Sequence, residues 1–423
     1  MIRASKSTET PLDAVHELSR AIARAGDPGS IYDLILDSVV KFLKVEKASI
    51  MTYDPSLGAL RVVAARGMDP SIMEKAVVRV GEGISGRVFA SHEPVLIREI
   101  ESGETGPGHE RYRTRSLISA PVTCFPMKVG EEALGVINVT DRTDGQPFTD
   151  ADVRLLTTLA DQAAAYLHIT RLLDERQATE RLRQQLEVAR QIQYKLLPSG
   201  PPSIEGLDVA GRLVTAERVG GDYYDSFLTH AKRASFVVAD VSGHSIGAAL
   251  IMAAFRAAMR AQMDADYSPA MLVQRINSIL HDDLFQSEQF ISMVYLQYVR
   301  SRQLIQYCAA GHPPPIVWRS SMNCFEEIGT GDGLLGIEAR GVFHERQMVV
   351  SKGDVVLLYT DGITEAANRE GERFGHKRLL GVLGDAVVGS ARQIVDVVVE
   401  STQAFVDPLP LSDDVTAMAI KVV

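Results

Sequence analysis

The sequence predicts an α+β protein with two folded regions joined by one long helix. Three observations support this class. Apolar runs of strand length and amphipathic helical segments occur on both sides of the chain's centre. The segment from Phe148 to Leu197 contains neither glycine nor proline. The 423 residues are also too many for one hydrophobic core, so two or three domains are expected.

The composition limits the partners and the location of the protein. A net charge of −10 argues against nucleic acid or an anionic membrane as the main partner. The three cysteines form no C-x-x-C pair, which fits a reducing compartment. The chain begins without an apolar segment of signal-peptide type, and no stretch reaches the about 18 uncharged apolar residues that span a bilayer. We therefore expect a cytoplasmic protein with no nucleic-acid partner and no membrane partner.

The N-terminal region has the pattern of an antiparallel sheet flanked by helices. Two amphipathic helical segments come first, and five apolar segments of strand length follow them. Glycine-containing connections separate these segments, as expected for turns. The expected helices cover residues 12–24 and 31–43, and the expected strands cover residues 48–53, 59–65, 95–97, 116–122 and 133–139.

A helix is expected to begin near Thr149, where Thr149 and Asp152 have the spacing of a capping box. The proline-rich stretch that starts at Pro198 ends it. At ~1.5 Å per residue, an unbroken helix here would extend roughly 70 Å, far more than one domain needs.

The second half of this helix carries a heptad pattern. Leu182, Ala189 and Leu196 recur every seven residues, and charged residues occupy the other faces. This pattern predicts a short two-stranded coiled coil or a helical bundle, and hence a dimer. The alternative is an amphipathic helix that lies on its own domain.

In the C-terminal region two helical segments stand between groups of strands, which predicts sheets with helices packed on their outer faces. Strands are expected over residues 207–241, 290–328, 343–359 and 415–422, and helices over residues 247–263, 269–284 and 391–405.

Four acidic positions in this region follow or precede apolar strands: Asp222, Asp240, Asp361 and the pair Asp413-Asp414. A single aspartate at such a place is more often a turn or cap residue than a metal ligand. Four such positions in one domain, several of them next to glycine, are stronger evidence for a metal site than any one of them alone. A carboxylate at the edge of a core is costly unless something pairs with it, and oxygen-only clusters suit Mg²⁺ or Mn²⁺. The pattern predicts a carboxylate-bound metal site.

The residues around these positions form ordered motifs. They are V-G-G-D-Y-Y-D, A-D-V-S-G-H-x-x-G-A-A-L, A-G-H-P-P-P, L-Y-T-D-G-I-T-E-A and S-D-D-V-T, preceded by A-R-x-I-Q-x-x-L-L-P. Over about residues 185–423 the chain resembles the SpoIIE/RsbU-type branch of the metal-dependent, type 2C-like (PPM) serine/threonine protein phosphatases. The resemblance implies an α-β-β-α sandwich with a site for two Mn²⁺ or Mg²⁺ ions.

The resemblance also implies a role for each acidic residue. Asp240 would bridge the two ions, with the Val241 carbonyl as a further oxygen ligand. Asp222 would hold the second ion, directly or through water, and Asp361 and Asp413 would hold the first. Asp240 and Asp361 are the positions on which catalysis would depend most. Such a metal pair supplies hydroxide near neutral pH and clamps the phosphoryl oxygens.

Two further carboxylates, Asp225 and Asp414, would orient the ligands. Ser245 stands where the family usually has glycine, and would strain the turn if that position needs a positive φ. His244 lies four residues after Asp240, whereas the type 2C histidine lies two residues after it, so no general acid is assigned.

The N-terminal region resembles a GAF sensor domain through V-G-E-G-I-S-G-R-V-F-A, S-L-I-S-A-P-V, G-V-I-N-V-T-D and P-F-T-D-A-D-V. Val139 and Val153 stand where cyclic-nucleotide-binding members have Lys and Glu, which argues against that ligand and leaves the signal unknown. We expect a GAF domain over residues 12–168, a helical coiled-coil linker over 169–197 and a phosphatase domain over 198–423.

Together these features predict a signal-controlled, metal-dependent protein phosphatase. The resemblance implies a substrate of STAS type, a phosphorylated anti-sigma-factor antagonist in a bacterial partner-switching pathway, and a homodimer formed through the GAF domain and the linker helix. The first alternative is a catalytically inactive phosphatase fold used for binding. A nucleotide cyclase is disfavoured because Tyr223 and Tyr224 follow Gly-Gly-Asp where Glu-Phe is needed. A sensor kinase is disfavoured because no ATP-lid motif follows His168.

Overall fold

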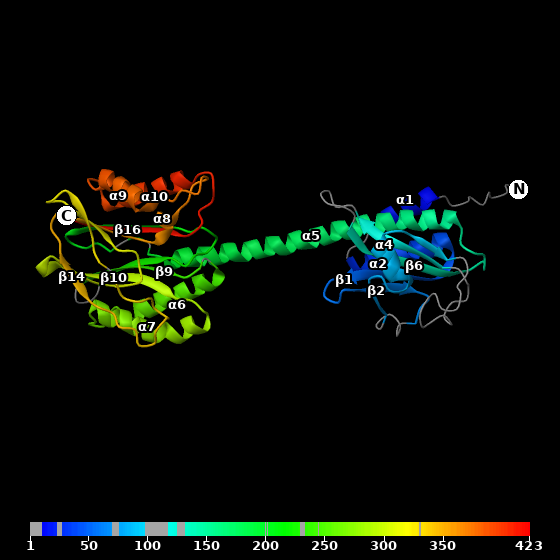
Figure 1. Cartoon of the computed structure of the whole chain (residues 1–423), viewed down its shortest axis with the longest axis horizontal. Helices are drawn as coiled ribbons and strands as arrows, with labels where there is room; N and C mark the ends of the chain where they lie inside the picture. The colour runs from blue at the N-terminus through cyan, green and yellow to red at the C-terminus, as the bar shows by residue number, and fades with distance from the viewer. Residues whose placement is uncertain are drawn as a thin grey trace. The chain divides into compact units, whose positions relative to one another are not determined.

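The computed structural model describes residues 11–22, 28–69, 76–97, 117–124, 132–198, 200, 202–228, 233–243, 245–329 and 331–423. The chain divides into two compact units, Met1–Glu180 and Arg181–Val423 (Figure 1). The predicted divisions after residues 168 and 197 fall within and just after helix α5 (Asp150–Leu196). No helix in the described ranges has both the length and the apolar character needed to cross a membrane.

The first unit is built on a six-stranded antiparallel sheet with the order β3-β2-β1-β6-β5-β4. Helix α2 and the start of α5 cover one face of this sheet, and α4 packs on the other. The strands are β1 (Val45–Asp54), β2 (Ala59–Arg66), β3 (Val77–Arg79), β4 (Val95–Ile97), β5 (Leu117–Cys124) and β6 (Glu132–Arg142), and the helices are α1 (Pro11–Ile22), α2 (Pro28–Leu43) and α4 (Gly83–Ser91).

This architecture confirms the predicted antiparallel sheet with flanking helices, but β3 and α4 were not expected from the sequence. Strand β3 is only three residues long. Helix α4 begins inside the glycine-rich segment that had been interpreted as a connection. Gly86 lies within this helix, and a Cβ there would lie 2.3 Å from the carbonyl oxygen of Arg79. At this position glycine permits close packing of the helix rather than a loop.

Helix α5 is 47 residues long and begins where the capping box was predicted. The Thr149 backbone N–H donates to Asp152 Oδ2 at 2.7 Å, and the Asp152 N–H approaches Thr149 Oγ1 at 3.4 Å. The reciprocal bonds satisfy donors that the first turn of a helix leaves free.

The second unit contains two five-stranded antiparallel sheets, with the orders β14-β11-β10-β9-β8 and β13-β12-β15-β16-β7. The strands of the first sheet are β8 (Tyr223–Leu228), β9 (Ala234–Val241), β10 (Ile291–Val299), β11 (Leu304–Ala310) and β14 (Arg346–Val349). Those of the second are β7 (Leu207–Val214), β12 (Ile316–Arg319), β13 (Cys324–Glu327), β15 (Val355–Tyr359) and β16 (Val415–Val422).

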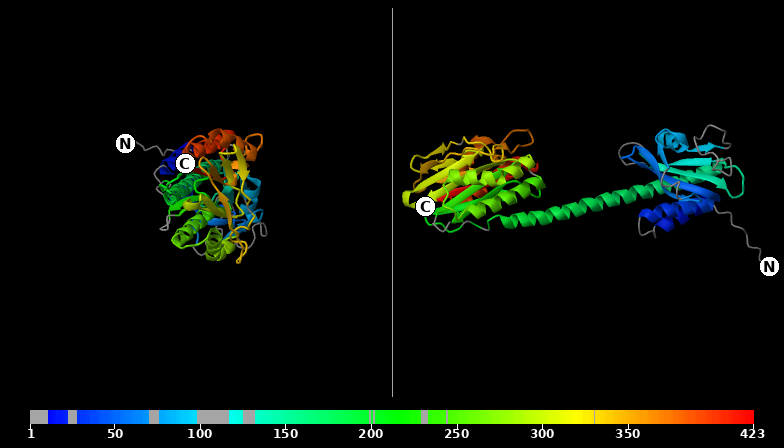
Figure 2. Two further views of the ribbon diagram at one scale, coloured as in Figure 1. Left: turned by 90° about the vertical axis from the view of Figure 1, so that its left-hand side faces the viewer. Right: turned by 90° about the horizontal axis from the view of Figure 1, so that it is seen from below.

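Helices cover the outer faces of both sheets. Figures 1 and 2 show α6 (Ile246–Gln262) and α7 (Pro269–Gln286) over one sheet, and α9 (Gly375–Ala386) and α10 (Ala391–Val406) over the other. One apolar core lies between the two sheets, and a further core lies under each helical layer. The predicted α-β-β-α sandwich is confirmed. Helix α9 and the short α8 (Asp361–Glu365) were not expected from the sequence.

Candidate metal centre

The pairing of the strands brings the acidic positions to one end of the sandwich. Asp222 immediately precedes β8, and Asp240 is the penultimate residue of β9, which pairs with β8. In the other sheet, Asp361 begins α8 shortly after β15 ends. Asp413 and Asp414 immediately precede β16, which pairs with β15. Because each pair is antiparallel, the end of one strand lies beside the start of the other.

Hydrogen bonds join the two sheets at this end. The hydroxyl groups of Thr360 and Thr416 both donate to Asp222 Oδ2, the first at 2.8 Å. The Asp222 backbone N–H donates to Asp414 Oδ2 at 3.3 Å, and the Ala216 N–H donates to Asp414 Oδ1 at 2.9 Å. Asp414 therefore holds the loop that carries Asp222, and its role in orienting metal ligands stays a prediction.

The carboxylates form a gradient from the interior to the solvent. Asp222 and Asp414 are buried, with 1% and 3% of their surface exposed. Asp240 is half-buried, whereas Asp361 and Asp413 are exposed. A molecule that approaches from solvent would thus meet Asp361 and Asp413 at the rim and Asp240 further in.

Burial and mutual repulsion raise the pKa values of these groups. The pKa of Asp222 is raised well above its usual range, first by burial and then by the charges of Asp240 and Asp414. Burial, followed by the charges of Asp361 and Asp413, raises the pKa of Asp240 to about 8. Although the Asp361 side chain is exposed overall, partial desolvation of its carboxyl group and then the charge of Asp413 raise its pKa. Neighbouring carboxylates, rather than arginine or lysine, are the main charges that act on these groups, so a bound cation would relieve their repulsion.

Glycines allow the loops that carry the carboxylates to approach one another closely. A Cβ on Gly220 would lie 1.8 Å from Asp414 Oδ2, and one on Gly221 would lie 2.5 Å from the Val241 carbonyl oxygen. A Cβ on Gly362 would lie 1.9 Å from the Asp414 carbonyl oxygen. Only glycine leaves room for these contacts.

Among the described residues, no three His, Cys, Asp or Glu side chains already form a group able to hold a metal ion. The arrangement is therefore a set of neighbouring carboxylates rather than a finished coordination shell. The chemistry of the donors fits a hard divalent cation, because all of them are oxygens and most are partly removed from water. The assignments of Asp222, Asp240, Val241, Asp361 and Asp413 as ligands remain predictions.

Asp225, predicted to orient the ligands, belongs to a different cluster. Tyr223 and Asp225 lie on the same face of β8, and this face packs against α6. The Tyr223 hydroxyl donates to Asp225 Oδ2 at 2.6 Å, and Arg260 Nη2 of α6 donates to the same oxygen at 2.7 Å. Asp225 thus anchors α6 to the sheet.

Sequence reasoning missed Gln193, which connects α5 to the Asp222 loop. Its side chain is buried, with Nε2 donating to the Gly220 carbonyl at 2.6 Å and Oε1 accepting from the Gly220 N–H at 3.1 Å. Arg256 of α6 also donates to the Leu196 carbonyl at the end of the helix. The last turns of α5 are therefore bound two residues away from Asp222.

Ser245 causes no strain at the start of α6. Its φ is −86°, and its side chain accepts from the Ala248 N–H, so it acts as the N-cap of the helix. A negative φ removes the need for glycine at this position. His244 lies outside the described residues.

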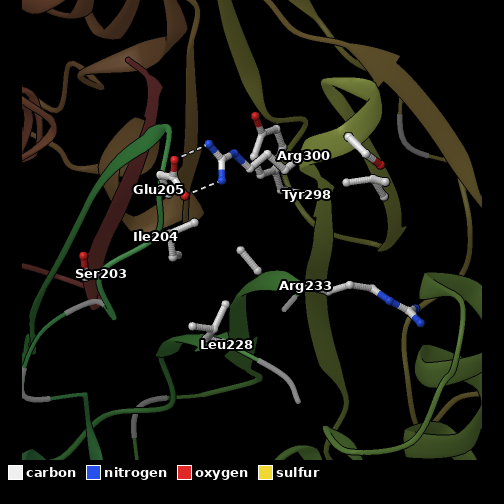
Figure 3. A pocket seen from close by; sticks show the side chains of 10 residues that line it. Ser203, Ile204, Glu205, Leu228, Arg233, Tyr298 and Arg300 are labelled. Atoms are coloured by element: carbon white, nitrogen blue, oxygen red, sulfur yellow. Dashed lines mark hydrogen bonds and ion pairs between the residues drawn. The ribbon is translucent and has the colours of Figure 1, made fainter. Parts of the chain in front are cut away.

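Two cavities of this unit, each about 650 Å³, are separate from the acidic centre. Figure 3 shows the first, which is lined by Leu228 and Ala234 and bordered by the ion pair between Glu205 and Arg300. Leu228 ends β8 and Ala234 begins β9, so this cavity lies at the opposite end of these strands from Asp222 and Asp240.

An α-β-β-α sandwich with acidic residues gathered at one end of its paired sheets defines a PPM-type phosphatase domain. Comparison with known proteins agrees. Residues 230–423 match the family model of stage II sporulation protein E (SpoIIE), and residues 25–168 match a GAF domain model. The chain combines an N-terminal GAF domain with a SpoIIE-type phosphatase domain.

Two curated relatives come from Bacillus subtilis. The phosphoserine phosphatase RsbU is 27% identical over 57% of this chain and 71% of its own length. The phosphoserine phosphatase RsbP is 26% identical over 43% of this chain, and the matched part is only 46% of RsbP. The solved SiaA-PP2C domain of Pseudomonas aeruginosa shares the fold, with a TM-score of 0.51 and 20% identity over 58% of this chain and 98% of that domain.

Proposed function

We propose that the protein is a signal-controlled, metal-dependent phosphoserine/phosphothreonine protein phosphatase. The observation that carries this proposal is the gathering of carboxylates from four separate strand ends into one partly buried, mutually repelling cluster. Two Mn²⁺ or Mg²⁺ ions would be held by Asp222, Asp240, the Val241 carbonyl, Asp361 and Asp413. When bound, such ions lower the pKa of water and offset the charge of phosphoryl oxygens.

The protein's own residues position this site. Thr360 and Thr416 hold Asp222, and Asp414 holds the loop before it. Neither described cysteine of this unit offers a thiolate at the acidic centre. Cys308 is fully buried and its pKa is raised to about 12. Cys324 is exposed, but it pairs with Arg319 near the start of β15, whereas Asp361 follows the end of that strand. This supports hydrolysis by activated water rather than by a covalent intermediate.

Signal control would act through α5. This helix begins against the GAF sheet and ends at the Gln193 contact with Gly220. A ligand or partner that changes the position or rotation of the helix would make or break that contact, and so shift the Asp222 loop between two states. The GAF domain would receive the signal.

The substrate would be a STAS-type protein, a phosphorylated anti-sigma-factor antagonist in a bacterial partner-switching pathway. The similarity to two phosphoserine phosphatases supports phosphoserine as the group that is hydrolysed. The active form would be a homodimer that pairs through the GAF domain and α5. Leu172, Leu173 and Leu182 of α5 support pairing, because each leaves at least half of its surface exposed.

The test uses Asp240→Asn and Asp361→Asn, with Asp385→Asn on α9 as a control, since Asp385 is an exposed aspartate outside the acidic cluster. With Mn²⁺, the first two variants should lose hydrolysis of both para-nitrophenyl phosphate and a serine-phosphorylated STAS-domain protein by at least ~100-fold, and the control should retain it. Persistent activity in Asp240→Asn would refute the site. Wild-type protein that binds Mn²⁺ in calorimetry but hydrolyses neither substrate would instead favour the inactive binding module.

A further inference from the structure

Large apolar side chains are exposed around the loop that follows Asp240. They project from the start of α6, the end of α7 and two adjoining loops. We call this set the apolar rim, and it consists of Ile246 (49% exposed), Leu250 (68%), Phe285 (71%), Phe290 (38%) and Ile337 (58%).

Hydrogen bonds tie the rim to the segment that follows Asp240. Ser242, two residues after Asp240, donates its N–H to the Phe290 carbonyl at 2.9 Å. In return, the Phe290 N–H donates to Ser242 Oγ at 3.0 Å, and Gln289 Nε2 donates to the Ser242 carbonyl at 3.2 Å. Phe290 is therefore held directly beside the loop that follows Asp240.

The α6 part of the rim adjoins the same segment. Ile246 and Leu250 are one helical turn apart, so they share a face of α6. Between them, a Cβ on Gly247 would lie 3.9 Å from the Gln289 amide nitrogen. A cavity of about 590 Å³ continues the rim and is lined in part by Ile246 and Val219, the latter from the loop before Asp222.

The end of α7 and the loop that carries Ile337 also lie close to Gln289. A Cβ on Gly336, next to Ile337, would lie 2.8 Å from Leu284 and 3.2 Å from the Gln289 carbonyl oxygen. Phe285 follows Leu284 in the chain. The elements that carry the five apolar side chains thus meet around Gln289 and Phe290.

We propose that the apolar rim is the docking surface for the phosphoprotein substrate. This inference rests on the proposed function. A phosphoserine side chain is short, so a folded protein that places its phosphate at Asp240 must also contact the surface beside Ser242. Exposed aromatic and aliphatic side chains grouped around a polar centre are typical of a protein-binding patch.

Charge favours a partner protein over a second copy of this chain. Asp282, Asp283 and Glu288 are exposed at the end of α7, next to Phe285. Two copies that met through this surface would bring these like charges together, which is unfavourable. The partner should therefore carry apolar residues and basic residues around its phosphoserine.

The test compares two double variants. Leu250→Gln with Phe290→Gln removes apolar surface from the rim. The control, Met322→Gln with Val388→Gln, removes apolar side chains that are 63% and 89% exposed elsewhere in the same unit. Each protein is assayed with Mn²⁺ on para-nitrophenyl phosphate and on a recombinant STAS-domain protein phosphorylated on serine. Binding of that phosphoprotein is also measured by calorimetry on an Asp240→Asn background.

The rim variant should bind the phosphoprotein at least ~10-fold more weakly, with kcat/KM on it reduced to match, and should hydrolyse para-nitrophenyl phosphate as wild type does. The control should match wild type in every assay. Unchanged binding, an equal loss on both substrates, or a changed oligomeric state in light scattering would overturn the inference. Failure of wild type to hydrolyse para-nitrophenyl phosphate would count against the proposed function instead, and the binding measurement would still decide the role of the rim.

Discussion

The contact between Gln193 and Gly220 gives the most specific prediction about control of the site. Gln193→Ala removes two buried hydrogen bonds, of 2.6 Å and 3.1 Å, and leaves the Gly220 N–H and C=O without these partners. A buried polar group left unsatisfied costs about 1–3 kcal/mol, so the two together should cost about 2–6 kcal/mol. Because Gly220 lies two residues before Asp222, part of this cost should appear as weaker Mn²⁺ binding.

We expect Mn²⁺ affinity to fall by about 10- to 100-fold in Gln193→Ala, as when an outer partner of a metal ligand is removed. Isothermal titration calorimetry measures this directly. Gln191→Ala is the matched control, because Gln191 lies on the same turn of α5 but is exposed. An Mn²⁺ dissociation constant for Gln193→Ala within twofold of wild type would refute the coupling between α5 and the Asp222 loop.

Two further predictions concern the metal-free protein, whose only tryptophan, Trp318, reports unfolding of the phosphatase unit. Folding raises the pKa of Asp240 from 3.8 to about 8. Between these values the folded state keeps a proton that the unfolded state releases, so the free energy of unfolding should fall as pH rises from 4 to 8. At about 1.4 kcal/mol per pKa unit, the free energy of unfolding could change by at most ~6 kcal/mol. Because neighbouring carboxylates share the repulsion, we expect Asp240→Asn to stabilise the metal-free protein at pH 8 by about 2 kcal/mol. Destabilisation by this substitution would contradict the reasoning. Gly220→Ala should displace Asp414 and destabilise the protein by about 1–3 kcal/mol in urea unfolding. The control Gly329→Ala should have little effect, because the space around a Cβ at Gly329 is open. Equal effects of the two substitutions would argue against close packing at Gly220.

The strand-end position of the acidic residues could be predicted because it depends on local pattern. Apolar runs such as Val355–Tyr359 form buried strands, and an aspartate next to such a run must lie at a sheet edge. Which strand ends lie next to one another depends on how the strands pair. The sequence indicated this pairing only through its resemblance to a family.

The contacts of Asp225 follow from its place on β8. Side chains alternate along a strand, so Asp225 faces α6 together with Tyr223. Its predicted role in orienting the metal ligands stays a prediction. The alternation was available in the sequence. The contact of Asp225 with Arg260 could not be predicted from local sequence, because 35 residues separate the two in the chain.

Gln193 could not have been recognised from local sequence. A glutamine on an amphipathic helix is usually solvated, and its two hydrogen bonds reach 27 residues along the chain. The short helices α4 and α8 were missed for a related reason, because glycine within them suggested turns while tertiary contacts determine their conformation.

The most direct test of the central claim is a titration of the full chain with Mn²⁺, followed by electron paramagnetic resonance. If the carboxylates from both sheets form one centre, wild type should bind two ions per chain and give the spectrum of a magnetically coupled pair, and Asp240→Asn should lose that spectrum. A wild-type protein that binds no Mn²⁺, or binds it equally well after Asp240→Asn, would contradict the account.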